Sequence, residues 1–175
     1  MAIPSFGKAS KASASAMANG NPAYIAAIQR SRSMLNKRAL VAGFAGAIPV
    51  PGLDWAVDAA LLSRLLPKIN AEFGLSAEQL DRLDPTQRER VQKAVSLVGT
   101  MLVGKFITKD LVLKAAKMIG MRLTAAQASK FVPLAGQAIS AIVGYAAIRY
   151  LGEQHIKDCV RVAQQAQLAL PAPGA

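Results

Sequence analysis

Apolar side chains recur every three or four residues along most of this chain, which is the spacing of one face of an α-helix. One stripe follows residue 54 and consists of Val57, Leu61, Leu62, Leu65, Ile69 and Phe73. Another follows residue 85 and consists of Val91, Val95, Val98 and Leu102. No stretch alternates apolar and polar residues for long enough to indicate a β-strand. The pattern predicts an all-α protein, a compact bundle of about five to six helices with flexible ends.

Proline, glycine and capping residues set the expected boundaries of the first helices. Pro22 is tolerated as the first residue of a helix, which should continue towards Ala47. Two prolines and a glycine then predict a rigid turn, and Asp54 is the expected N-cap of the helix that follows. The predicted structural turn consists of Pro49, Pro51, Gly52 and Asp54.

Similar signals divide the rest of the chain. Pro67 lies inside the helix that starts at the turn, and it predicts a kink or an early end there. Ser76 and Gln79 have the spacing of a capping box and predict a short helix that ends near Leu83. The remaining boundaries are expected at Asp84–Pro85, Thr108, Thr124, Pro133 and, for a long final helix, about Gln167.

Composition indicates one domain with two unstructured ends. The 175 residues are 53% hydrophobic but only 5% aromatic, which predicts close packing of Ala- and Gly-rich helices over residues 22–167. Residues 1–21 are rich in Ser, Ala and Gly and lack the apolar core of a secretory signal peptide, so a flexible lead-in is expected. Residues 168–175 contain two prolines and predict a disordered tail.

Positive charge is concentrated in two parts of the chain. The net charge is +11, yet residues 1–53 hold no acidic residue and residues 54–90 hold seven. This distribution predicts an anionic partner, either membrane lipid or nucleic acid. Lipid is favoured because few aromatic side chains are present to stack on bases, although a merely solvated basic face is an alternative. The predicted lipid-binding residues are Lys105, Lys109, Lys114, Lys117, Arg122, Lys130, Arg30, Arg32, Lys37 and Arg38.

Three uncharged stretches suggest contact with a membrane. They cover residues 39–53, 94–104 and 131–148, and a simple transmembrane helix needs about 20 apolar residues. Deep insertion of a hairpin around residue 50 would be costly, because Asp54 and Asp58 lie close to its tip. We therefore expect shallow, peripheral association, with a soluble bundle and true spanning as alternatives.

Two pairs of reactive residues have helical spacing. Asp54 and Asp58 are four residues apart, but charges in a first helical turn are favoured by capping and by the helix dipole. His155 and Cys159 are also four apart, and a lone pair on a helix lacks the oxyanion donors and the third, orienting group that catalysis needs. With one Cys and one His, the sequence predicts no metal site, no cofactor and no enzyme activity.

Two short motifs resemble a known family. The first is Ala47-Ile48-Pro49-Val50-Pro51-Gly52-Leu53-Asp54, followed by an apolar helix with Arg64 and then an acidic helix. The second comprises Lys130-Phe131-Val132-Pro133, Gly136 and Tyr150-Leu151-Gly152. Over about residues 39–163 the chain resembles the helical domain of unknown function of YcjF-type inner-membrane proteins, which also follows the GTPase domain of some bacterial Era-like GTPases. Leu134 stands where that family usually has a glycine.

The resemblance implies membrane association, a partner GTPase and no catalytic role. A GTPase would have to be a separate chain, since no Gly-x-x-x-x-Gly-Lys-Ser/Thr motif is present here. The sequence thus predicts a non-enzymatic helical domain on the cytoplasmic face of a bacterial inner membrane, which binds anionic lipid, a protein partner or both. A homo-oligomer is a further alternative. The alternative is a pore-forming or secreted effector whose apolar hairpin inserts into a target membrane.

Overall fold

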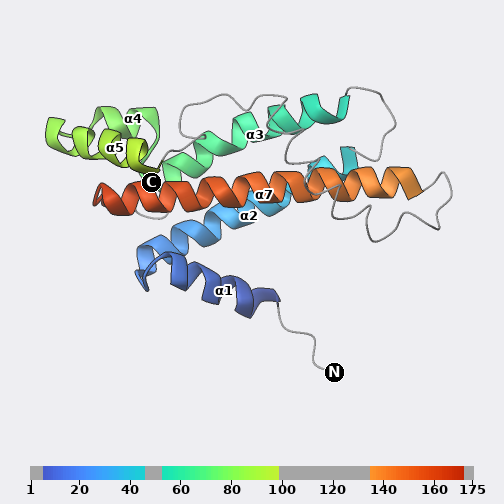
Figure 1. Cartoon of the computed structure of the whole chain (residues 1–175), viewed down its shortest axis with the longest axis horizontal. Helices are drawn as coiled ribbons and strands as arrows, with labels where there is room; N and C mark the ends of the chain where they lie inside the picture. Colours follow the sequence, from blue (N-terminus) through green and yellow to red (C-terminus); the bar gives the residue numbers. More distant parts are fainter. Residues whose placement is uncertain (1–5, 46–52, 99–134, 172–175) are drawn as a thin grey trace. The chain divides into compact units, whose positions relative to one another are not determined.

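The computed structural model describes residues 6–45, 53–98 and 135–171, and side chains over 12–41, 62–98, 145–146 and 148–171 (Figure 1). Within these ranges every regular element is a helix, which confirms the predicted all-α class. The helices are α1 (Phe6–Met17), α2 (Pro22–Ala45), α3 (Leu53–Glu72), α4 (Ala77–Asp81), α5 (Pro85–Val98) and α7 (Ala135–Gln165).

The chain divides into two compact units, where the sequence predicted a single domain. The described residues of the first unit are 6–33, 67–98 and 155–171, and those of the second unit are 34–45, 53–66 and 135–154. The boundaries after residues 33, 66 and 154 fall inside long helices, so α2, α3 and α7 each contribute residues to both units. Composition could not reveal this division, because the helices run through it without a linker.

The described residues near both ends of the chain make contacts within the first unit. Helix α1 occupies most of the expected lead-in, where Ala14 of the helix and Ala18, the residue that follows it, are buried. The amide of Gln164 in α7 donates to the backbone oxygen of Met17 at 3.2 Å. At the other end Leu168 is buried, while residues 172–175 lie outside the described part. Alanine-rich segments form helices readily, and their small side chains allow a close approach to a neighbour.

The helix starts follow the local capping signals of the sequence. The side chain of Asn21 accepts a hydrogen bond from the backbone of Ala23 at 3.0 Å, with Pro22 as the first helical residue. Ser76 and Gln79 form the predicted capping box of α4, with reciprocal hydrogen bonds of 3.3 and 3.0 Å. Ahead of α5, Asp84 Oδ1 accepts from the backbone N–H of Gln87 at 2.9 Å. Each such cap stabilises a helix by about 1 kcal/mol.

Helix α3 begins one residue earlier than expected and continues past Pro67. It begins at Leu53, so Asp54 is a residue of the first turn and not the cap before it. The helix continues through Pro67 to Glu72, so the early end that the proline predicts does not occur. An internal proline costs about 3 kcal/mol. Two large side chains beyond the proline, Ile69 and Phe73, are buried. Each such burial stabilises the fold by about 1.5–3 kcal/mol, which offsets the cost of the proline.

A glycine closes α3. Gly74 has a φ of +73°, which only glycine adopts without strain. This conformation lets the N–H of Leu75 bond to the oxygen of Asn70 at 2.9 Å and that of Gly74 to the oxygen of Ala71 at 3.3 Å, which is a Schellman motif. Leu75 is buried next to the end of the helix, so the turn directs the chain back towards the core of the first unit.

Helices α2, α3, α5 and α7 bury apolar side chains in the first unit. Tyr24 contributes its ring, and its hydroxyl donates to the oxygen of Leu168 at 3.4 Å. The predicted stripe of α5 is buried only in part, because Val91 is buried whereas Val95 and Val98 are half-buried. The largest other buried side chains of this unit are Ile28, Ile69, Phe73, Ile156 and Val162.

The second unit has a smaller described core, in which α2 and α7 make close contact. Its buried residues are Leu35, Ala39, Leu62, Leu65, Leu66, Ile148 and Leu151. A Cβ atom added to Gly152 would lie within 3.0 Å of three side-chain atoms of Leu35. The guanidinium of Arg149 also donates to Asn36 and lies 3.9 Å from the carboxylate of Glu153. None of the described helices is both long and apolar enough to cross a membrane.

Candidate functional site

A polar group lies in the core of the first unit, between α3 and α7. His155 and Cys159 are completely buried, one turn apart on α7, and Asn70 faces them from the last turn of α3. His155 Nε2 lies 2.7 Å from Asn70 Oδ1, and Cys159 Sγ lies 3.4 Å from the same oxygen. The sulfur is also 3.5 Å from His155 Nε2. The spacing of His155 and Cys159 is visible in the sequence, whereas Asn70, 85 residues away from His155, carries no local signal that links it to them.

The helix ends explain why Asn70 is held in place. Its backbone oxygen accepts the hydrogen bond from Leu75 that closes α3. The burial of Ile69 and Phe73 fixes the rotation of the same turn. The side-chain amide therefore points at one turn of α7 with little freedom, and it links two helices that meet inside the first unit.

The geometry of this group is unlike that of a cysteine nucleophile. A catalytic imidazole accepts the thiol proton with one ring nitrogen while a third residue orients the other nitrogen. Here one atom, Nε2, faces both Asn70 and Cys159. With Asn70 Oδ1 as the acceptor, Nε2 carries a proton and cannot take one from the thiol.

The thiol is also poorly placed for ionisation. Burial raises the pKa of Cys159 well above its ordinary value, and the nearby carboxylate of Asp158 raises it further. The thiolate is the reactive form of cysteine, so this side chain is held in its unreactive state. The arrangement can connect α3 to α7 through buried hydrogen bonds, and that is the chemistry it supports.

Two of the predicted lipid-binding cations are engaged within the fold. Arg30 Nε lies 2.6 Å from Glu72 Oε2, and both side chains are largely covered, so this ion pair joins α2 to α3. Arg32 donates to Ser13 Oγ at 3.2 Å and contacts Met17 Sδ at 3.6 Å, which ties α2 to α1. Neither charge is fully available to a lipid headgroup.

The other two described cations lie on an exposed part of α2. Lys37 and Arg38 are exposed, and so are Leu40 and Val41, at 54% and 50% of their full area. At about 100° per residue these four side chains occupy an arc of about 160° on one side of the helix. The buried residues Leu35 and Ala39 lie on the opposite side. We call the four exposed residues the α2 face.

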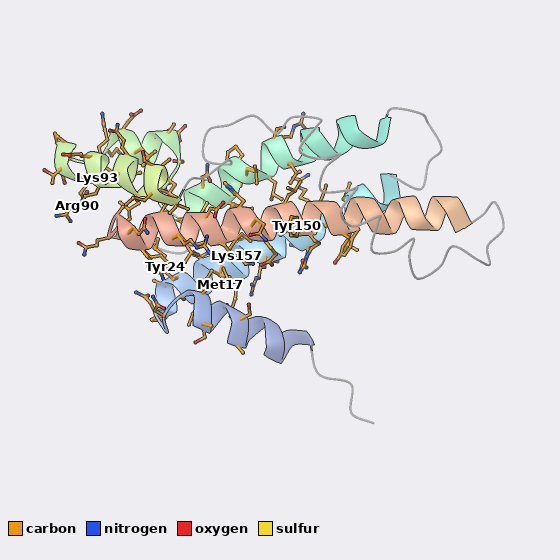
Figure 2. The ribbon with its side chains drawn as sticks, in the orientation of Figure 1. Met17, Tyr24, Arg90, Lys93, Tyr150 and Lys157 are labelled. Carbon is orange, nitrogen blue, oxygen red and sulfur yellow. The ribbon has the colours of Figure 1, made fainter. Side chains whose placement is uncertain are left out.

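Charge and apolar area coincide on the α2 face. The sequence holds no acidic residue before Asp54, so no acid on α2 itself can pair with Lys37 or Arg38. Elsewhere in the described part of the chain the exposed large apolar residues do not occur in neighbouring pairs. Leu97 on α5 and Tyr150 on α7 are single exposed apolar residues, and Figure 2 labels Arg90 and Lys93 on α5, a helix that also carries Glu89.

The rest of the predicted site residues lie outside the described residues or have side chains outside the described set. Lys105, Lys109, Lys114, Lys117, Arg122 and Lys130 lie outside the described residues, as do Pro49, Pro51 and Gly52. Asp54 and Asp58 are on α3, but their side chains are outside the described set. Among the described side chains, no three His, Cys, Asp or Glu residues are grouped as a metal site would require.

Comparison of the chain with protein-family models, with curated proteins and with solved structures gives no match.

Proposed function

We propose that this protein is a non-enzymatic helical domain that associates with a membrane by binding anionic lipid. The observation that carries the proposal is the α2 face, where two exposed cations and two exposed aliphatic side chains share one side of a helix. Surfaces of this composition suit the boundary between charged headgroups and acyl chains. The high net charge of +11 favours the same partner.

The strength of the interaction depends on more than the α2 face. Each basic residue close to an anionic leaflet contributes about 1 kcal/mol. Lys37 and Arg38 alone would therefore give weak binding, and the six basic residues between Lys105 and Lys130 are proposed to add to it. The covered positions of Arg30 and Arg32 make them the weakest contributors of the ten predicted residues.

The buried Asn70–His155–Cys159 group supports a role without catalysis. Its hydrogen bonds occupy the groups that a nucleophilic mechanism would need, and burial raises the pKa of the thiol. A variant with Cys159→Ala should therefore bind lipid as the natural protein does, provided that circular dichroism shows the same helix content.

A separate protein, such as the GTPase that the family resemblance implies, is the second candidate partner. The exposed residues Leu40 and Val41 favour it, because paired aliphatic side chains also suit a protein interface. A protein partner would be expected to protect the α2 face in the absence of any membrane.

Co-sedimentation with liposomes tests the proposal. The Lys37→Glu, Arg38→Glu double variant is compared with a matched control, Arg90→Glu with Lys93→Glu on α5, which changes the net charge equally. On vesicles with 30% phosphatidylserine we expect the α2 variant to bind at least about 30-fold more weakly, since loss of the two cations alone removes about 2 kcal/mol and the two carboxylates add repulsion. The control should lose clearly less. Absence of binding to any vesicle, or equal binding to vesicles of neutral phosphatidylcholine, would overturn the proposal.

A further inference from the structure

The two aliphatic residues of the α2 face have no role in the fold that the described contacts explain. Leu40 and Val41 lie opposite Leu35 and Ala39, which supply the buried side of the same helix. Of the four large apolar side chains that are exposed in the described part of the chain, two are these neighbours. Single exposed aliphatic residues are common, whereas a neighbouring pair beside two cations is less so.

We propose that Leu40 and Val41 insert below the headgroups of an anionic membrane, while Lys37 and Arg38 remain at headgroup level. The inference rests on the proposed function and adds a mode of attachment to it. Headgroup contact alone is weakened by salt, because ions screen exposed charges. Inserted aliphatic side chains supply a part of the binding that salt does not weaken.

The positions on the helix support this division of roles. Leu40 follows Lys37 by three residues, and Val41 follows it by four, so both aliphatic side chains lie beside the lysine on the helix surface. The long apolar stem of lysine can reach along the helix while its ammonium stays in water. A helix lying flat on the membrane could therefore place the aliphatic side chains in the interface without burying a charge.

If these side chains insert, the protein should prefer membranes whose headgroups are loosely packed. Leu40 and Val41 would enter a membrane most readily where curvature has opened gaps between lipids. Small, strongly curved anionic vesicles should therefore bind the protein more tightly than large ones of the same composition. Replacement of Leu40 and Val41 by serine should remove this preference, but a replacement of Leu97 should not.

An environment-sensitive fluorophore on an introduced cysteine tests the insertion directly. Leu40→Cys and Val41→Cys report on the α2 face, and Leu97→Cys, a site exposed to 76%, is the control on α5. The natural chain serves as the blank, because its single cysteine is buried and has a raised pKa. On vesicles with 30% phosphatidylserine, emission at positions 40 and 41 should shift to the blue and be quenched by lipids spin-labelled near the headgroup.

The serine variants supply the second measurement. At 0.5 M salt, Leu40→Ser with Val41→Ser should bind curved anionic vesicles at least ten-fold more weakly than the natural chain, and Leu97→Ser should bind normally. If the protein binds and releases with salt, yet positions 40 and 41 stay in water and the serine variants bind normally, insertion is wrong and the lipid-binding proposal stands. If no vesicle is bound, both proposals fail.

Discussion

Helix α2 carries basic residues in both of its halves, but those in the first half contact other helices and those in the second half are exposed. In the first unit Arg30 meets Glu72 of α3, and Arg32 contacts Ser13 and Met17 of α1. In the second unit, two turns further along the helix, Lys37 and Arg38 are exposed. All four cations belong to one acid-free stretch of sequence. Their different situations show that a charge becomes available to a partner only where the neighbouring helices do not already bind it.

Glu72 makes the difference in the first unit. It is the last residue of α3, which reaches that position only because the helix continues through Pro67. A helix that stopped at the proline would have left Arg30 without this carboxylate. The extent of α3 therefore decides whether Arg30 forms an ion pair within the fold or stays available to a partner.

The buried side of α2 should be the most sensitive part of this helix. Gly152→Val places a Cβ atom and two methyl groups where Leu35 already fills the space, and we expect the free energy of unfolding to fall by about 2–3 kcal/mol. Urea denaturation followed by circular dichroism measures the change. Leu35→Ala in the same chain should restore part of the stability that the valine removes. Additive losses in the double variant would show that these two residues do not contact each other as described.

The Arg30–Glu72 ion pair should have an intermediate effect. Its side chains are 31% and 23% exposed, and so it lies between surface pairs, which contribute about 0–1 kcal/mol, and fully buried pairs. We expect Arg30→Gln to lower the free energy of unfolding by about 1 kcal/mol. Lys37→Gln, the same kind of change on the exposed half of α2, is the matched control and should have almost no effect. Similar losses in both variants would contradict the distinction between the two halves.

Alkaline pH should weaken the core of the first unit. The pKa of Cys159 is raised in the folded state above the ordinary value of 9.0, so the folded chain holds the thiol proton more tightly than the unfolded chain. The stabilisation is complete below pH 9 and is lost as the pH rises towards the folded pKa. Between pH 9 and 10 the natural chain should lose up to about 1 kcal/mol more stability than Cys159→Ala. Parallel pH profiles of the two proteins would show that the thiol titrates normally.

Local signals in the sequence were sufficient for many of the helix boundaries. Pro22, the Ser76–Gln79 capping box and Asp84 act over a few residues, and the structure confirms the helix starts that they predict. Capping energies depend on neighbours in the chain, so no knowledge of the tertiary fold is needed to recognise them.

Contacts between distant residues could not be predicted in the same way. Asn70 and His155 are 85 residues apart, and Arg30 and Glu72 are 42 apart. Helix α3 continues through Pro67, and α1 forms in a segment expected to be flexible. Both depend on tertiary burial, which can outweigh local preferences. The sequence therefore predicted ten cations as one class of lipid-binding residue, whereas the structure separates the four on α2 into two that contact other helices and two that are exposed.

The exposed half of α2 should show the smallest effect on stability. Lys37→Ala with Arg38→Ala removes two side chains that point away from the buried residues Leu35 and Ala39. Exposed substitutions of this kind change the free energy of unfolding by less than about 0.5 kcal/mol, and alanine slightly favours the helix. Urea denaturation should therefore give the natural midpoint within error, while binding to anionic vesicles becomes weaker. Loss of stability comparable to that of Arg30→Gln would mean that Lys37 and Arg38 also hold the fold together, and the contrast between the two halves of α2 would be wrong.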